Sequence, residues 1–146
     1  MRARTACLIG LMAVVFSGCR MPHTSTPAWS STSTGLGIID LVTGKGSSPR
    51  TGQTCVVEAL GWVEESKGKG KGLPFLDTRK RGFPAIFPLG VGRVIKGWDE
   101  GLATMKPGGK RLLRIPPALG YTPAEAGKDI PPGATLIFEL ELIELR

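Results

Sequence analysis

The chain has 146 residues, a formal net charge of +7 and a hydrophobic fraction of 41%. This length accommodates one domain and a short extension. The single histidine, His23, lies outside the part that we expect to fold, and Cys55 is the only cysteine within that part. The folded part therefore lacks the side chains for a metal site, a disulfide or a nucleophile activated by histidine, and no cofactor is expected.

The first eighteen residues have the pattern of a signal peptide. Two arginines precede an apolar run over residues 6–16, and Ser17-Gly18 follow it. The run is shorter than the about 20 residues that span a bilayer. Phe16-Ser17-Gly18-Cys19 resembles a bacterial lipobox, in which the cysteine carries the lipid. We therefore expect an exported lipoprotein, attached to a membrane through Cys19 and facing the periplasm or the cell exterior. The alternative is an ordinary secretory signal and a soluble exported protein.

Residues 19–35 are expected to form a flexible tether. Ten of the sixteen residues from Arg20 to Gly35 are Ser, Thr or Pro, and the segment has no apolar period. Such a composition buries too little apolar surface to order a chain. Trp29 is expected to be an isolated exposed aromatic residue within this tether.

Residues 36–146 are predicted to form one α+β domain. Alternating apolar residues between Gly- or Pro-rich boundaries predict strands over residues 36–42, 54–63, 83–89, 110–115 and 136–146. One helix is predicted over residues 98–105, because Trp98, Leu102 and Met105 follow helical spacing and Pro107 comes soon after. An antiparallel sheet that covers this short helix is the expected architecture.

Positive charge is concentrated between residues 67 and 81. Six basic residues face only Asp77 there, whereas the rest of the chain after the signal peptide is balanced. The ordinary interpretation is a solvated loop. The alternative is contact with anionic lipid headgroups, which is worth about 1 kcal/mol per basic residue near the surface. Nucleic acid is not an expected partner of an exported protein.

Six short motifs occur in a characteristic order. They are Gly52-Gln53-Thr54-Cys55-Val56-Val57, Arg81-Gly82-Phe83-Pro84, Leu89-Gly90, Val94-Ile95-Lys96-Gly97-Trp98, Gly120-Tyr121 and Ile130-Pro131-Pro132-Gly133-Ala134-Thr135-Leu136. In this order they resemble FKBP-type peptidyl-prolyl cis-trans isomerases over about residues 36 to 146, above all the small single-domain bacterial and thylakoid-lumen members.

The resemblance implies a fold and an activity. The fold is a twisted antiparallel β-sheet wrapped around one short α-helix, and the activity is isomerisation of X-Pro bonds. X-Pro-containing polypeptides are the implied substrates, and macrolide-type inhibitors are implied ligands. Nothing in the sequence calls for oligomerisation, so we expect a monomer.

The resemblance also implies a site. Trp98 forms its floor beneath the proline ring, and Ile130 closes it. The apolar walls come from Phe75, Phe87, Val94 and Phe138. The backbone N–H of Ile95 and the hydroxyl of Tyr121 donate to the carbonyls that flank the bond. The family's catalytic aspartate falls on Leu76 when the chain is counted back from Arg81-Gly82, and on Asp77 after a shift of one residue; both registers are open.

Two alanines depart from the family pattern. Ala59 stands where many active members have a tyrosine, and Ala85 where many have a further aromatic residue. We expect a wider pocket, a reduced efficiency and an altered preference for the residue before proline. The alternative is a non-catalytic FKBP-like module that holds Pro-containing segments. A third interpretation is that the basic loop 67–81 docks the domain to a membrane or an acidic partner.

Overall fold

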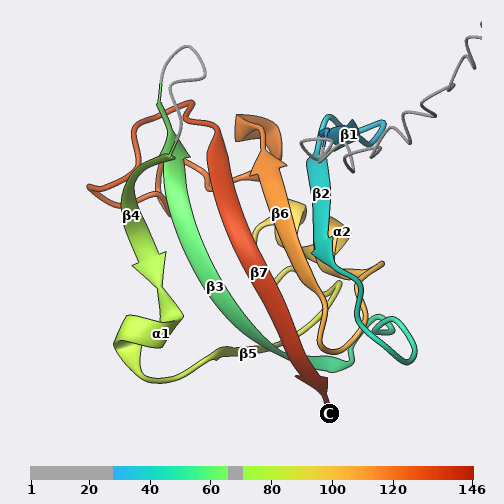
Figure 1. Cartoon of the computed structure of the whole chain (residues 1–146). Helices are drawn as coiled ribbons and strands as arrows, with labels where there is room; N and C mark the ends of the chain where they lie inside the picture. Colours follow the sequence, from blue (N-terminus) through green and yellow to red (C-terminus); the bar gives the residue numbers. More distant parts are fainter. Residues whose placement is uncertain (1–27, 66–70) are drawn as a thin grey trace, which may run out of the picture.

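The computed structural model describes residues 28–65 and 71–146 (Figure 1). The predicted signal peptide, Cys19, the first part of the predicted tether, and Lys67 and Lys69 of the basic loop lie outside the described residues. Within the described part of the chain, no helix is long and apolar enough to cross a membrane.

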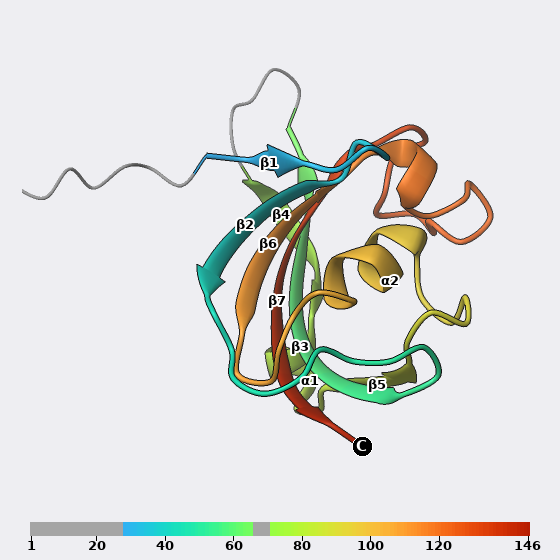
Figure 2. The same cartoon turned by 90° about the vertical axis from the view of Figure 1, so that its right-hand side faces the viewer.

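One twisted antiparallel sheet curves around a short helix, as the side view in Figure 2 shows. Its strands lie in the order β1-β2-β6-β7-β3-β4, and β5 forms an additional pair with β3. The strands are β1 (Ser30–Ser31), β2 (Gly37–Val42), β3 (Thr54–Glu64), β4 (Lys71–Asp77), β5 (Ala85–Pro88), β6 (Lys110–Ile115) and β7 (Leu136–Leu145). The predicted α+β fold class is therefore confirmed.

In the described residues, three short helices lie in the connections between strands. They are α1 (Thr78–Arg81), α2 (Lys96–Leu102) and the 3-10 helix η1 (Pro117–Leu119). The helix enclosed by the sheet is α2, and it begins and ends earlier than the predicted range 98–105. It ends early because the Met105 N–H donates to the Leu102 carbonyl at 2.9 Å, which closes a three-residue turn instead of continuing the α-helix.

The core lies between α2 and the inner face of the sheet. Alternate residues of β7, from Leu136 to Leu142, are buried on this face. Two glycines bring α2 close to β6, since a Cβ at Gly97 would lie 2.7 Å from Ile115 Cγ2 and one at Gly101 would collide with Leu113. The helix that carries Trp98 is thereby held tightly against the sheet.

The fold includes residues that we assigned to the tether. Ser30 pairs with Ile38, so β1 extends the sheet beyond β2. Trp29 lies across Gly37, where an added Cβ would be 3.2 Å from the indole ring. Composition does not reveal this packing, because it depends on the space that one glycine leaves in a neighbouring strand.

The sequence analysis also missed β4 and α1. Lys-Gly alternation and Pro74 are untypical of a strand, yet β4 lies at the edge of the sheet, where a proline interrupts few ladder bonds. The next helix ends at Gly82, whose φ of 81° lies in the left-handed region. The predicted strand over residues 83–89 is consequently shorter, and Phe83 is exposed.

Candidate functional site

Five aromatic rings from five parts of the chain contact one another in series. The ring centroids are 5.7 Å apart for Phe87–Trp98, 5.2 Å for Trp98–Phe138, 5.5 Å for Phe138–Phe75 and 6.5 Å for Phe75–Tyr121. The last three contacts are edge to face, a favourable geometry for aromatic rings. We call these residues the ring series. It joins β5, α2, β7 and β4 to the segment after η1.

Gly61 on β3 provides the space in which the ring series assembles. It pairs with Phe138 on β7 and with Leu76 on β4. An added Cβ at Gly61 would lie 2.8 Å from Phe138 Cδ1 and 3.1 Å from Phe75 Cζ. A larger residue at this position would displace the rings, and nothing in the sequence pattern marked this glycine as part of the site.

A register shift in β4 turns two successive apolar side chains inward. The β3–β4 pairing is irregular between Gly61 and Trp62, opposite Phe75. Successive residues of a regular strand point to opposite faces, whereas Phe75 and Leu76 both pack against the core cluster. Asp77 consequently points the other way.

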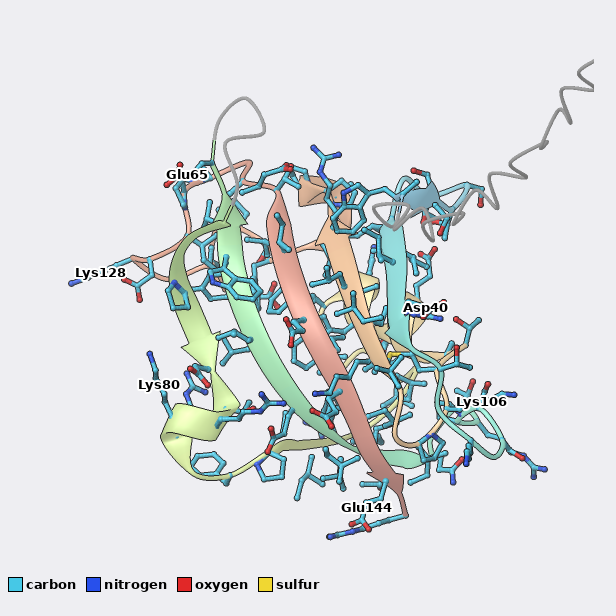
Figure 3. All side chains as sticks on the ribbon, in the orientation of Figure 1. Asp40, Glu65, Lys80, Lys106, Lys128 and Glu144 are labelled. Atoms are coloured by element: carbon cyan, nitrogen blue, oxygen red, sulfur yellow. The ribbon has the colours of Figure 1, made fainter. Side chains whose placement is uncertain are left out.

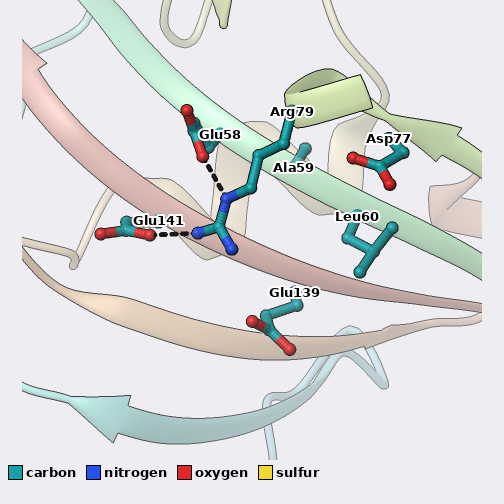
Figure 4. A pocket seen from close by; sticks show the side chains of 7 residues that line it. All are labelled: Glu58, Ala59, Leu60, Asp77, Arg79, Glu139 and Glu141. Atoms are coloured by element: carbon teal, nitrogen blue, oxygen red, sulfur yellow. Dashed lines mark hydrogen bonds and ion pairs between the residues drawn. The ribbon is translucent and has the colours of Figure 1, made fainter. Parts of the chain in front are cut away.

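Asp77 is therefore not part of the site, although one of the two registers made it a candidate catalytic residue. Its carboxylate caps α1 by accepting a hydrogen bond from the Lys80 N–H at 3.1 Å. It borders a cavity of about 170 Å³ on the outer face of the sheet, with Glu58, Glu139 and Arg79 (Figure 4). The structure adopts the register in which Leu76 takes the aspartate's place.

A second cavity, of about 590 Å³, lies at the Tyr121 end of the ring series. Val94 and Ile95 line one side, and the segment that contains Gly120 and Tyr121 lines the other. The Ile95 N–H makes no hydrogen bond to the described residues, so it is an available donor at the cavity. Asp99 holds the preceding loop, because its carboxylate accepts from the Gly90 N–H at 2.8 Å.

Tyr121 is half-buried, and its hydroxyl makes no hydrogen bond within the described part of the chain. Burial raises the pKa of Tyr121, the positive charge of Arg81 lowers it, and Glu125 raises it to a smaller extent. The net effect is an increase, so the phenol is protonated and can donate at neutral pH. Ile130 packs beside it and lines, with Tyr121, a small cavity of about 30 Å³.

Trp98 is 4% exposed, and its indole Nε1–H has no acceptor among the described residues. A buried donor without a partner costs about 1–3 kcal/mol. Trp98, Phe87 and Phe138 are buried behind the large cavity and do not line it. The predicted site residues thus fall into a buried aromatic group and a cavity-lining group, with Asp77 outside both.

Sequence reasoning also missed Thr78, which attaches α1 to β3. Its buried hydroxyl accepts from the Ala59 N–H at 2.9 Å and donates to the Ala59 carbonyl at 3.3 Å. The signal for this helix was the Asp77-Thr78 pair, since an aspartate before a short polar run is typical of a helix N-cap.

Comparison with known proteins gives consistent results. Residues 45–143 match the sequence profile of the protein family described as FKBP-type peptidyl-prolyl cis-trans isomerase. An FK506-binding protein of Neisseria meningitidis serogroup B is 47% identical over 111 residues, which cover 76% of this chain and 96% of that protein. FK506-binding protein 1 of Dictyostelium discoideum is 45% identical over 112 residues, covering 77% of this chain and 99% of that protein.

Two solved structures share the fold. The crystal structure of AtFKBP13 is similar with a TM-score of 0.71 and 38% identity, over 82% of this chain and 99% of that one. The crystal structure of FkpA from Escherichia coli has a TM-score of 0.69 and 38% identity, over 81% of this chain and 51% of that one.

Proposed function

The chain belongs to the family of FKBP-type peptidyl-prolyl cis-trans isomerases, and from this premise we propose that it isomerises X-Pro bonds of exported or folding proteins. Rotation about a peptide bond has a barrier of about 18–20 kcal/mol, so uncatalysed X-Pro isomerisation takes tens to hundreds of seconds. Catalysis needs no nucleophile, metal or general acid. It needs a site that binds the twisted amide more tightly than either planar form.

The ring series and its neighbouring donors suit this task. A twisted amide loses resonance and its carbonyl becomes less polar, so apolar surroundings favour it over the planar forms. The Ile95 N–H and the Tyr121 hydroxyl are available to the carbonyls beside the bond. The observation that carries the proposal is that the ring series ends at the large cavity with the Tyr121 hydroxyl unbonded. A thousandfold acceleration requires about 4 kcal/mol of preferential binding.

The test is cis–trans exchange in short X-Pro peptides, followed by NMR exchange spectroscopy with the full-length protein. We expect acceleration that depends on X and that FK506 inhibits, because the relatives are named FK506-binding proteins. Absence of acceleration by a folded protein contradicts the proposal.

The second candidate function is a binding module that holds Pro-containing segments without turning them over. Ala59, Ala85 and Leu76 favour it, because each replaces a side chain that many active family members carry in the pocket. Peptide binding without acceleration of exchange, in the same samples, is the result that selects this function over the first.

We further propose that Cys19 is lipidated and anchors the domain to a membrane, facing the periplasm or the cell exterior. The lipobox-like sequence Phe16-Ser17-Gly18-Cys19 supports this. Membrane contact through the basic loop has less support, because Arg79 pairs with Glu58 and Glu141 and Lys80 lies 3.8 Å from Asp77. The anchor is therefore assigned to the cysteine alone.

A further inference from the structure

The cavity of about 590 Å³ carries positive and negative charge on different sides. Arg93 and Lys96 line the side that leads into α2, and Glu125 lines the side that contains Tyr121. The other described residues of the lining are uncharged, so two cations and one anion give the lining a formal net charge of +1. Both positive charges belong to the α2 side.

Neither cation is neutralised by the described residues. Arg93 and Lys96 are exposed, and their side chains make no ion pair or hydrogen bond to the described part of the chain. Asp99 and Glu100 follow Lys96 at the i+3 and i+4 positions, from which a carboxylate commonly pairs with a lysine. Both are bound elsewhere: Glu100 accepts from the Thr34 hydroxyl at 2.8 Å, and Asp99 binds the loop before α2.

The bonds of Asp99 fix the backbone that carries Arg93. Its carboxylate accepts from the Gly90 N–H at 2.8 Å and from the Gly92 N–H at 3.3 Å. These glycines have φ values of 74° and 73°, in the left-handed region that favours glycine. The loop is thus held at two points immediately before Arg93, which reduces the conformational entropy that this residue loses when it binds a ligand.

The acid on the other side of the cavity is held by its own segment. The Glu125 carboxylate accepts from the Thr122 hydroxyl at 2.7 Å and from the Thr122 N–H at 3.0 Å. It makes no ion pair with Arg93 or Lys96. A polypeptide in the cavity therefore meets two unpaired cations on the α2 side and one hydrogen-bonded anion on the Tyr121 side.

We propose that Arg93 and Lys96 are specificity-determining residues that select substrates with acidic side chains beside the proline. The inference rests on the proposed isomerase function and names the substrate class for that site. A glutamate or aspartate of the bound segment supplies the counter-charge that Asp99 and Glu100 do not supply. The gain is modest, because an exposed ion pair contributes little, and it weakens as salt is added.

The experiment compares three peptides that share a Leu-Pro-Phe centre and carry two Glu, two Gln or two Lys residues on each side of it. For the full-length wild-type protein at low ionic strength, we expect kcat/KM for the Glu peptide to exceed that for the Gln peptide about threefold, and the Lys peptide to fall below both. In the double variant Arg93→Gln/Lys96→Gln the Glu to Gln ratio falls to about one. In the wild type it falls toward one in about 1 M NaCl, where the Debye length is about 3 Å.

The double variant Lys45→Gln/Lys106→Gln is the matched control. It removes the same charge near the other end of α2, where Lys106 (labelled in Figure 3) lines a different cavity of about 110 Å³ and the Lys45 N–H donates to the Pro107 carbonyl at 2.9 Å. The Glu to Gln ratio should stay at the wild-type value in this variant. A loss as large as in Arg93→Gln/Lys96→Gln would show that the net charge of the protein sets the preference, and it would overturn the inference.

Failure of this inference is distinguishable from failure of the proposed function. Turnover of the Gln peptide without any preference for the Glu peptide overturns the role of Arg93 and Lys96 and leaves the isomerase intact. If no peptide is turned over, peptide affinities are measured by titration calorimetry. Tighter binding of the Glu peptide that Arg93→Gln/Lys96→Gln removes then supports the recognition, and equal affinities overturn it.

Discussion

Phe75 and Tyr121 meet edge to face, with their ring centroids 6.5 Å apart and their planes at 80°. Phe75 lies on the edge strand β4, and Tyr121 follows η1 in a different part of the chain. Their contact joins the ring series to the segment that lines the large cavity. The position of the Tyr121 hydroxyl therefore depends on the irregular pairing that turns Phe75 inward.

Tyr121→Phe should lower kcat/KM for X-Pro peptides by about threefold to tenfold, because it removes one hydrogen-bond donor to the substrate and little else. The ring contact with Phe75 is retained, so the urea midpoint should not change. Exchange rates and urea unfolding on the same samples check both parts. A large fall in stability would mean that the hydroxyl has a structural role.

Tyr121 should ionise above the ordinary tyrosine range. Its pKa is raised mainly by burial, and Arg81 opposes the shift, so Arg81→Gln should raise the pKa further. Because the folded pKa exceeds the unfolded one, the contribution to stability is full below the unfolded pKa and is lost as the pH rises through the folded pKa.

Ultraviolet titration of the phenolate can measure this directly, since the chain has one tyrosine. Lys80→Gln provides the control, because that side chain is not among the causes of the shift. An unchanged midpoint in Arg81→Gln would contradict the effect of the Arg81 charge on the pKa of Tyr121.

Gly61→Ala should destabilise the protein by about 1–3 kcal/mol, because the new methyl group would overlap Phe138 in a packed core. Turnover should fall as well, since the rings must shift. Gly120→Ala is the control for stability, as its Cβ would meet Leu136 only at 3.5 Å. Equal unfolding free energies for the two variants would disprove the steric account.

Thr78→Val should cost about 1–3 kcal/mol in unfolding free energy, because it leaves the Ala59 backbone groups without their buried partner. Thr78→Ser keeps the hydroxyl and should lose less. Equal unfolding free energies for the valine and serine variants would contradict this account.

Cys19→Ser should release the protein from the membrane fraction into the soluble exported fraction. A single lipid-modified cysteine is the only anchor that we propose, so no membrane-bound population should remain. Fractionation and immunoblotting of cells that express either form make the comparison. Wild-type protein that is already soluble after export would refute the lipobox interpretation.

Local patterns predicted the regular parts of the fold well. The strand at Lys110–Ile115 has the predicted bounds, and Leu136–Leu145 ends one residue before the predicted end. These strands alternate in one clear period, and the sheet buries one face of each. The helix ends three residues earlier than predicted because the chain after Leu102 closes a tighter turn, in which the Met105 N–H donates to the Leu102 carbonyl.

Features that depend on distant partners were beyond the sequence. The direction of the Asp77 side chain could be predicted only from the β3–β4 pairing. One irregular step in this pairing decides which side chains of β4 point inward and which point outward. Likewise, the need for glycine at position 61 arises from two rings on other strands. The aromatic members of the site were predictable from the motif order, whereas the place of Thr78 depends on a helix that the sequence analysis had not found.

The short pairing of β1 with β2 has a mechanical consequence. Two residue pairs hold β1, whereas nine hold β3 to β7. Tension applied through the segment that precedes Ala28 therefore reaches β1 first, and β1 detaches from the sheet before the longer ladders are strained. Three members of the ring series lie on β7, β4 and β5, and β2 and β6 separate these strands from β1. A domain pulled from its N-terminus thus yields at β1 before the strands that carry these three rings are strained.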